Sequence, residues 1–298
     1  MMFGMTMGEG DAGGRLFPRG LDGVDPITAV LLADARRALA AYPELVGAGA
    51  LFTSAEEVPG GWRLVRPLDP LPQGARELLA GLLDDEALVA SPDAAGELRA
   101  AARELRRRPA DEVSAAGRRF RIVRVEQLIR TGPDGPEPPR PTDLDTGDAR
   151  PHAPDLLPVD GPPPDLAAEL LCQVLDAGTE AGREPSGDHL TPVTLAPAFT
   201  LAERNGGRWR PAGRLHAAPE AAREALVTYL RHVVPVVEDP DPADAAAYAE
   251  AADLMADGTR RNGVAAAGRR FRVVRIERVT LLGPDGPEPP RPADVDAR

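Results

Sequence analysis

The sequence is poor in the residues that most often build cross-linked, metal-binding or aromatic sites. Cys172 is the one cysteine among 298 residues, so an intrachain disulfide, a Cys-x-x-Cys redox pair and a zinc site of several cysteines are excluded. Aromatic residues make up 4% of the chain, so we expect cores of leucine, valine and alanine. The glycine-rich phosphate loops, the nucleophile elbow and the zinc-protease pattern are missing, and no cofactor is indicated.

Lysine is absent as well, so all 35 basic residues are arginines. Asparagine occurs only at Asn205 and Asn262, which indicates a gene rich in G and C, so clusters of arginine carry little evidence of function. Acidic residues number 47, and the net charge of −12 opposes binding to nucleic acid or to an anionic membrane surface.

Long hydrophobic runs are missing too. No stretch of about 18 apolar residues is present, so no membrane-spanning helix is expected. The first residues lack the basic region and the apolar run of a signal peptide. We therefore expect a cytoplasmic protein with no membrane contact and with a disordered tail over residues 1–23.

What the sequence does contain is a long repeated segment. Residues 114–143 and 265–294 match at an offset of 151, and both include GRRFR and GPDGPEPPRP. Upstream the match is fainter and has an offset of 147, at which Trp62 matches Trp209. We interpret the chain as a tandem duplication. Repeat 1 covers residues 24–143, a proline-rich linker covers 144–164, and repeat 2 covers 165–298.

Each repeat is expected to have the order α-β-β-α-α-β. In repeat 1, apolar residues at helical spacing predict helices that begin at Pro26, Pro72 and Pro92, and strands are expected at residues 49–54, 61–66 and 118–129. In repeat 2, Pro211 weakens the second strand of the hairpin. The fold class is α+β, with helices packed on a small, mostly antiparallel sheet. Pairing of the two final strands, or of the two sheets edge to edge, would give a pseudo-twofold molecule.

The segment GPDGPEPPRP predicts a turn at Pro-Asp-Gly followed by an extended arm with polyproline II character. One interpretation is an arm that lies over its own domain and closes the edge of the sheet. The other is an arm that docks on a partner, because Pro138, Pro139, Arg140 and Pro141 fit the PxxP pattern.

The final strands are rich in arginine and carry one phenylalanine each, at Phe120 and Phe271. Such a strand is able to bind single-stranded nucleic acid by stacking and phosphate contacts, although the paired aromatics of an RNA-binding sheet are missing. The other interpretation is that these arginines pair with acids on the same domain or across the domain interface.

The histidines are His152, His189, His216 and His232, and none of them has a counterpart in repeat 1. They show no metal-ligand spacing, so no metal site and no catalytic residue is assigned. A single site in repeat 2 or in the cleft between the repeats stays open, with His189, His216 and Asp188 as its candidates. Cys172 is expected to be a packing residue of the first helix in repeat 2.

The strand GRRFRIVRVE, the arm GPDGPEPPRP and the FT…GGWR hairpin resemble an uncharacterised family of actinobacterial proteins. The resemblance covers most of each repeat and is most specific in its final thirty residues. It implies a bacterial cytoplasmic protein of unknown function in which the domain is often duplicated, and it implies no catalytic residues.

These observations favour a non-enzymatic module that binds another protein or a second copy of itself. The alternatives are a hydrolase or transferase with a single site and a nucleic-acid-binding protein that uses the arginine strands. Tryptophan and arginine dominate interface hot spots. The residues expected to contact a partner are Trp62, Arg63, Phe120, Arg121, Arg124 and Arg140 in repeat 1 and Trp209, Arg210, Phe271, Arg272, Arg275 and Arg291 in repeat 2.

Overall fold

The computed structural model of the chain describes residues 26–145, 156–158, 171, 174 and 188–294. Asp25, His152 and Cys172, together with the predicted tail over residues 1–23, lie outside the described residues. We call residues 26–145 the first half and residues 188–294 the second half.

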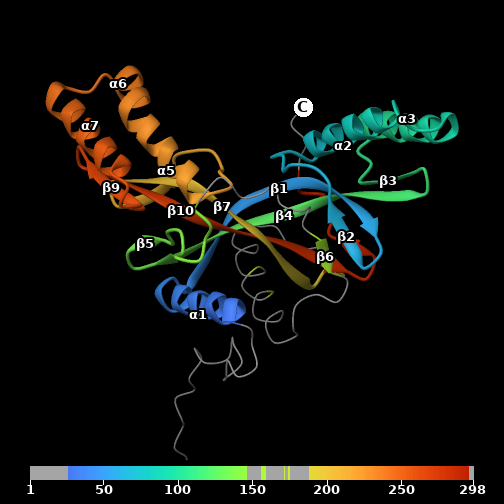
Figure 1. The fold of residues 1–298 in the computed structure, drawn as a ribbon, viewed down its shortest axis with the longest axis horizontal. Helices are drawn as coiled ribbons and strands as arrows, with labels where there is room; N and C mark the ends of the chain where they lie inside the picture. The colour runs from blue at the N-terminus through green and yellow to red at the C-terminus, as the bar shows by residue number, and fades with distance from the viewer. Residues whose placement is uncertain (1–25, 146–155, 159–170, 172–173, 175–187, 295–298) are drawn as a thin grey trace, which may run out of the picture.

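The first half contains three helices and five strands among its described residues (Figure 1). In chain order they are α1 Pro26–Ala41, β1 Glu44–Val58, β2 Gly61–Leu64, α2 Pro72–Glu86, α3 Pro92–Arg107, β3 Glu112–Ala115, β4 Arg118–Gly132 and β5 Gly135–Pro136. Strand β1 is much longer than the predicted 49–54, because a bulge between Gly47 and Ala50, with Gly49 at φ 101°, lets the strand continue.

The second half repeats this order from its first long strand onward. Its described elements are β7 Thr191–Asn205, β8 Arg208–Pro211, α5 Pro219–Thr228, the π-helix Tyr229–Val233, α6 Val234–Val237, α7 Pro242–Ala256, β9 Gly263–Ala266, β10 Arg269–Gly283 and β11 Gly286–Pro287. The short strand β6 Leu156–Pro158 lies between the halves, inside the predicted linker. The predicted weakening of the hairpin at Pro211 does not prevent β8 from pairing with β7.

All strands pair antiparallel in one sheet, whose main path is β6-β2-β1-β4-β10-β7-β8 within the described part of the chain. The two final strands, β4 and β10, pair at its centre, which is one of the two expected arrangements. Gln127 faces Arg278 there, and these positions match at the offset of 151. A pseudo-twofold axis therefore passes between them.

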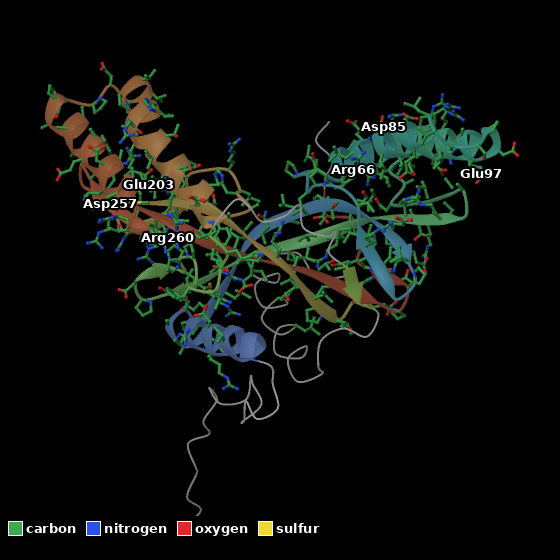
Figure 2. The ribbon with its side chains drawn as sticks, viewed as in Figure 1. Arg66, Asp85, Glu97, Glu203, Asp257 and Arg260 are labelled. Atoms are coloured by element: carbon green, nitrogen blue, oxygen red, sulfur yellow. The ribbon has the colours of Figure 1, made fainter. Side chains whose placement is uncertain are left out.

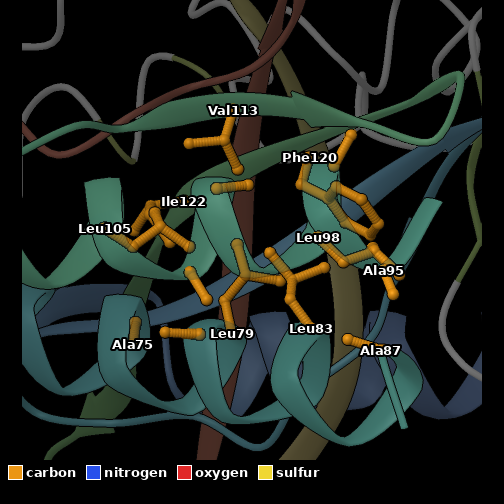
Figure 3. Close-up of a cluster of buried hydrophobic side chains, with 14 of the residues drawn as sticks. Ala75, Leu79, Leu83, Ala87, Ala95, Leu98, Leu105, Val113, Phe120 and Ile122 are labelled. Atoms are coloured by element: carbon orange, nitrogen blue, oxygen red, sulfur yellow. The ribbon is translucent and has the colours of Figure 1, made fainter. Parts of the chain in front are cut away.

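The α+β class is confirmed, and the helices cover the two ends of the sheet. Helices α2 and α3 lie over one end, α5 to α7 lie over the other, and α1 lies on the opposite side (Figure 1). Under α2 and α3, Leu79, Leu83 and Leu105 pack on Phe120 and Ile122 of β4 (Figure 3). A matching cluster under α5 and α7 contains Leu226, Tyr248 and Phe271.

A third buried cluster joins the halves on the other face of the sheet. It contains Trp62 and Val123 from the first half, Val193 and Leu282 from the second, and Leu157 of β6. Leu157 is only 1% exposed, so β6 is part of the buried core rather than a solvated linker.

The helix starts show how well the local signals predicted structure. Helices α2, α3, α5 and α7 all begin at a proline, which suits the first turn because that turn lacks an acceptor for its amides. The Asp241 side chain accepts from the amides of Ala243 and Asp244, as expected for a cap. Ser91 makes no such hydrogen bond.

Candidate functional site

The two proline-rich arms, residues 132–143 (arm 1) and 283–294 (arm 2), are exchanged between the halves. Each arm starts as a short hairpin on its own final strand, through β5 or β11. It then crosses to the other half. The amide of Arg275 donates to the Glu137 carbonyl, and the amide of Arg124 donates to the Glu288 carbonyl, both at 2.9 Å. Beyond the hairpin both arms bind the other half, which corrects the interpretation that each arm lies over its own domain. Arm 1 also keeps a contact with its own half, where the Thr142 amide donates to Asp34 of α1.

Arm 2 is held by buried ion pairs on the first half. The Nε of Arg124 lies 2.8 Å from a carboxylate oxygen of Asp294, and its Nη1 contacts Glu126. Arg291 binds Glu288 of its own arm at 2.8 Å and reaches Glu126 at 3.2 Å. Because Arg124 and Glu288 are each 1% exposed, this network excludes water and fixes the arm in place.

Arm 1 repeats the same contacts on the second half. Arg275 contacts Asp143 at 3.1 Å, and Arg140 binds Glu137 at 2.6 Å and Glu277 at 2.7 Å. Burial alone would raise the pKa of Glu277, but the charges of Arg275, Arg140 and Arg130 outweigh burial and hold this pKa below its usual value. Glu277 therefore stays ionised and pairs with the arm.

Each arm also has a glycine against a tryptophan of the other half. A Cβ built on Gly286 would lie 2.6 Å from Trp62 Nε1, and one on Gly135 would lie 2.2 Å from Trp209 Nε1. Next to these contacts, the Arg121 guanidinium donates to the Pro287 carbonyl at 3.2 Å and the Arg272 guanidinium donates to the Pro136 carbonyl at 2.9 Å. Only glycine fits such a close approach, which explains why both arms contain Asp-Gly.

Many arginines of β4 and β10 form ion pairs with acids. Arg118 binds Glu56 and Glu86, Arg119 binds Glu112 at 2.7 Å, and Arg121 binds both Glu112 and Asp285. In the second half, Arg269 binds Glu203, whose position Figure 2 shows, at 2.8 Å. These contacts favour the interpretation of the arginines as ion-pair residues over the interpretation as phosphate ligands.

The histidine candidates for a catalytic site do not converge. His189 lies before β7, with Nε2 3.6 Å from Asp285. His216 forms backbone hydrogen bonds with Phe199, eight residues along β7 from Thr191, which is about 26 Å of strand. Burial, and then the charge of Arg214, lowers the pKa of His216. Among the described residues, no group of three or more His, Cys, Asp or Glu is arranged to hold a metal ion.

The strongest difference between the halves lies at the two outer edges of the sheet. Strand β6 covers the edge of β2, with Gly61 opposite Pro158, Trp62 opposite Leu157 and Arg63 opposite Leu156. The matching strand β8 pairs only with β7 within the described part of the chain. Among the described residues, no strand pairs with its outer edge, and we call this the open edge of β8.

A groove of about 420 Å³ lies beside Trp209, between β8, β9 and arm 1. It is lined mainly by apolar groups from four distant parts of the chain, together with the Arg272 guanidinium, which stacks 5.0 Å from the Trp209 ring. The principal lining residues are Tyr42, Pro138, Trp209, Val264, Ala265 and Arg272. Trp209 is only partly buried, whereas Trp62 is 6% exposed.

The predicted partner-binding residues divide according to their burial. Phe120 and Phe271 lie in the helix-covered cores, where they present no surface, and Trp62 lies beneath β6. Arg121, Arg124, Arg275 and Arg291 are buried in ion pairs with the arms and neighbouring acids. Arg63 and Arg140 are half-buried, and Trp209, Arg210 and Arg272 stay accessible beside the groove.

Sequence reasoning missed the groove and β6. Tyr42, Pro138 and Val264 join Trp209 only after the arms have crossed and β10 has paired with β4. A signal for β6 was present, since Leu156 and Leu157 interrupt a proline-rich segment as an apolar pair.

Comparison with known proteins places the chain in a family without assigning an activity. No described helix has the length and apolar character needed to cross a membrane. No curated protein and no solved structure matches the chain. A family model does match over residues 25–297, and the chain therefore belongs to DUF5954, a family of unknown function.

Proposed function

We propose that this protein is a non-enzymatic binding module that takes an extended apolar peptide at the open edge of β8. One observation carries the proposal. The matching edge of β2 is covered by the short strand Leu156–Pro158, which buries Leu157 against Trp62. The edge of β8 has the same register, its own tryptophan and no covering strand in the described residues. β6 is thus an example of the ligand that this edge accepts.

The chemistry of the site indicates what it would bind. An open strand edge offers backbone amides and carbonyls, which give affinity without depending on side chains. Specificity would come from Trp209, because its match Trp62 is the residue that faces the apolar Leu157 of β6. The ligand class is therefore an extended segment of the form Leu-apolar-Pro, with its central apolar residue over Trp209.

We also propose that the chain arose by tandem duplication. The repeated order of elements, the Gln127–Arg278 pairing and the reciprocal docking of the arms support this origin. The support bears on function, because a duplicated chain has two matching edges, and the pairing of β6 with β2 shows what kind of segment such an edge binds.

Fluorescence anisotropy with a dye-labelled peptide of residues 153–160 tests the proposed site. The peptide is titrated with the full chain and with a chain that begins at Gly23, which keeps all described residues. We expect the peptide to bind at least one of these two chains. In the chain that binds, Trp209→Ala should weaken the affinity for the peptide at least tenfold, which corresponds to about 1.4 kcal/mol.

Two controls make the result specific. A peptide with Leu157→Asp should not bind, because a carboxylate cannot pack against Trp209 without losing its hydration. Arg106→Ala, whose ion pair with Asp84 lies on the helices, should leave binding unchanged. Failure of the wild-type peptide to bind either chain, or equal binding after Trp209→Ala, would contradict the proposal.

A further inference from the structure

We infer that the segment Leu16, Phe17 and Pro18 of this same chain is the strand that occupies the edge of β8. This inference rests on the proposed binding site and names its occupant. Leu16-Phe17-Pro18 matches Leu156-Leu157-Pro158 at an offset of 140. The same offset relates Asp25 to Asp165, the residues just before the first helix expected in each repeat. The apolar pair followed by proline thus precedes both helices at one spacing.

The observed pairing of β6 gives the register. Pro158 faces Gly61, Leu157 faces Trp62 and Leu156 faces Arg63. The offset of 147 that relates Trp62 to Trp209 converts these pairs into Pro18 with Arg208, Phe17 with Trp209 and Leu16 with Arg210. Proline ends the short strand in both cases, a position that suits an edge strand because proline lacks an amide to donate.

Chain length permits the same connection in both places. Seven residues separate Pro18 from Pro26, where α1 begins, and seven separate Pro158 from the matching Leu166. Seven residues in extended form span about 25 Å. The number of residues between the apolar pair with its proline and the first helix expected in the repeat is thus the same in both repeats.

The exposure of matching apolar residues shows what a covering strand would bury. Val193 of β7 is 8% exposed in the cluster that holds Trp62 and Leu157. Its match on β1, Val46, is 42% exposed, and Trp209 is likewise more exposed than Trp62. Phe17 at the position of Leu157 would cover this apolar surface, and a phenylalanine offers more area for that contact than leucine does.

An occupant on the same chain has a consequence for binding. A tethered segment competes at an effective concentration in about the millimolar range, so an external peptide must displace it. The site is then self-occupied in the free protein, and a partner gains access by supplying a stronger strand or by holding the segment elsewhere.

Disulfide trapping tests the inference in the full-length chain. In a Cys172→Ser background, Leu16→Cys is combined with Arg210→Cys, and the matched control combines Leu156→Cys with Arg63→Cys on the observed β6–β2 pair. Under mild oxidation we expect both pairs to form a disulfide within one chain, visible as a monomer of altered mobility without reductant. A third pair, Leu16→Cys with Arg106→Cys on α3, should keep free thiols.

The outcomes separate the inference from the proposed function. Free thiols in the Leu16–Arg210 pair, with the control pair closed, would overturn the inference, and so would a disulfide formed only between two chains. The peptide assay gives an independent reading. Phe17→Asp should strengthen binding of the 153–160 peptide at least tenfold, and equal affinity for the wild type and Phe17→Asp would overturn the inference while leaving the binding site intact.

Discussion

Gln127 of β4 faces Arg278 of β10 across the centre of the sheet, and the two residues hold matching positions in the two halves. A pair of matching residues faces each other only where a twofold axis passes. The central contacts of the arms therefore recur in both halves, so that Arg124 with Asp294 corresponds to Arg275 with Asp143. The exchanged arms make the halves interdependent, and departures from symmetry, such as the open edge of β8, become informative.

The buried arginines of the arm networks should be needed equally in both halves. Arg124→Met or Arg275→Met removes the cation but keeps much of the volume, and leaves the partner carboxylates buried without their charge partner. We expect each change to lower the free energy of unfolding by about 3–5 kcal/mol, measured by urea denaturation. Arg106→Met, on an exposed ion pair with Asp84, should cost less than about 1 kcal/mol. A loss in only one half would contradict the reciprocal arrangement.

The two glycines that contact the tryptophans should respond differently to alanine. Gly286→Ala places a Cβ against Trp62, which is buried beneath β6 and has no room to move. Gly135→Ala places a Cβ against Trp209, which borders the open groove and is able to shift. Both glycines have positive φ, at 122° and 107°, so both changes add backbone strain.

We therefore expect Gly286→Ala to lower the melting temperature more than Gly135→Ala. The control is Gly60→Ala, which shares the positive φ but has no atom within 4 Å of the added Cβ, and so reports the strain alone. Equal losses for all three variants, measured by thermal unfolding, would show that the contacts with the tryptophans add nothing to the strain.

The pKa shifts predict acid sensitivity. Glu277 and Glu56 have folded-state pKa values below 4.5, because the arginines around each carboxylate outweigh the effect of burial. A carboxylate with a lowered folded pKa contributes stability that is complete above the unfolded value and is lost as the pH falls through the folded value. The melting temperature should therefore stay nearly level down to about pH 5 and fall below pH 4.5. Glu277→Gln should be less stable at pH 7 and lose less on acidification, whereas parallel profiles would contradict the assignment.

Local patterns predicted much of the fold. The prolines at 26, 72 and 92 marked helix starts, because the first helical turn tolerates a missing amide. The apolar residues around Phe120 and Ile122 predicted a strand over residues 118–129, and β4 covers that range. The order of elements in each half follows from signals that lie within about fifteen residues of one another.

What the sequence did not predict depends on contacts between distant residues. The two arms share the same ten residues, so their sequence does not indicate whether an arm lies on its own half or on the other half. The arms bind the other half because Arg124 and Arg275 contact the arm carboxylates there, in the sheet formed by the pairing of β4 with β10. Four of the arginines proposed for a partner, Arg121, Arg124, Arg275 and Arg291, are buried in ion pairs of this kind. Trp62 and Trp209 look equivalent in sequence, and β6 alone makes their surroundings differ.

Hydrogen exchange at the two edges tests the central claim most directly. In the chain that begins at Gly23, backbone amides of residues 61–63 should exchange slowly because β6 covers them, while those of residues 208–210 should exchange fast. Addition of the 153–160 peptide should slow exchange at residues 208–210 and leave residues 61–63 unchanged. Equally slow exchange at both edges before the peptide is added, or no change after it, would contradict the account.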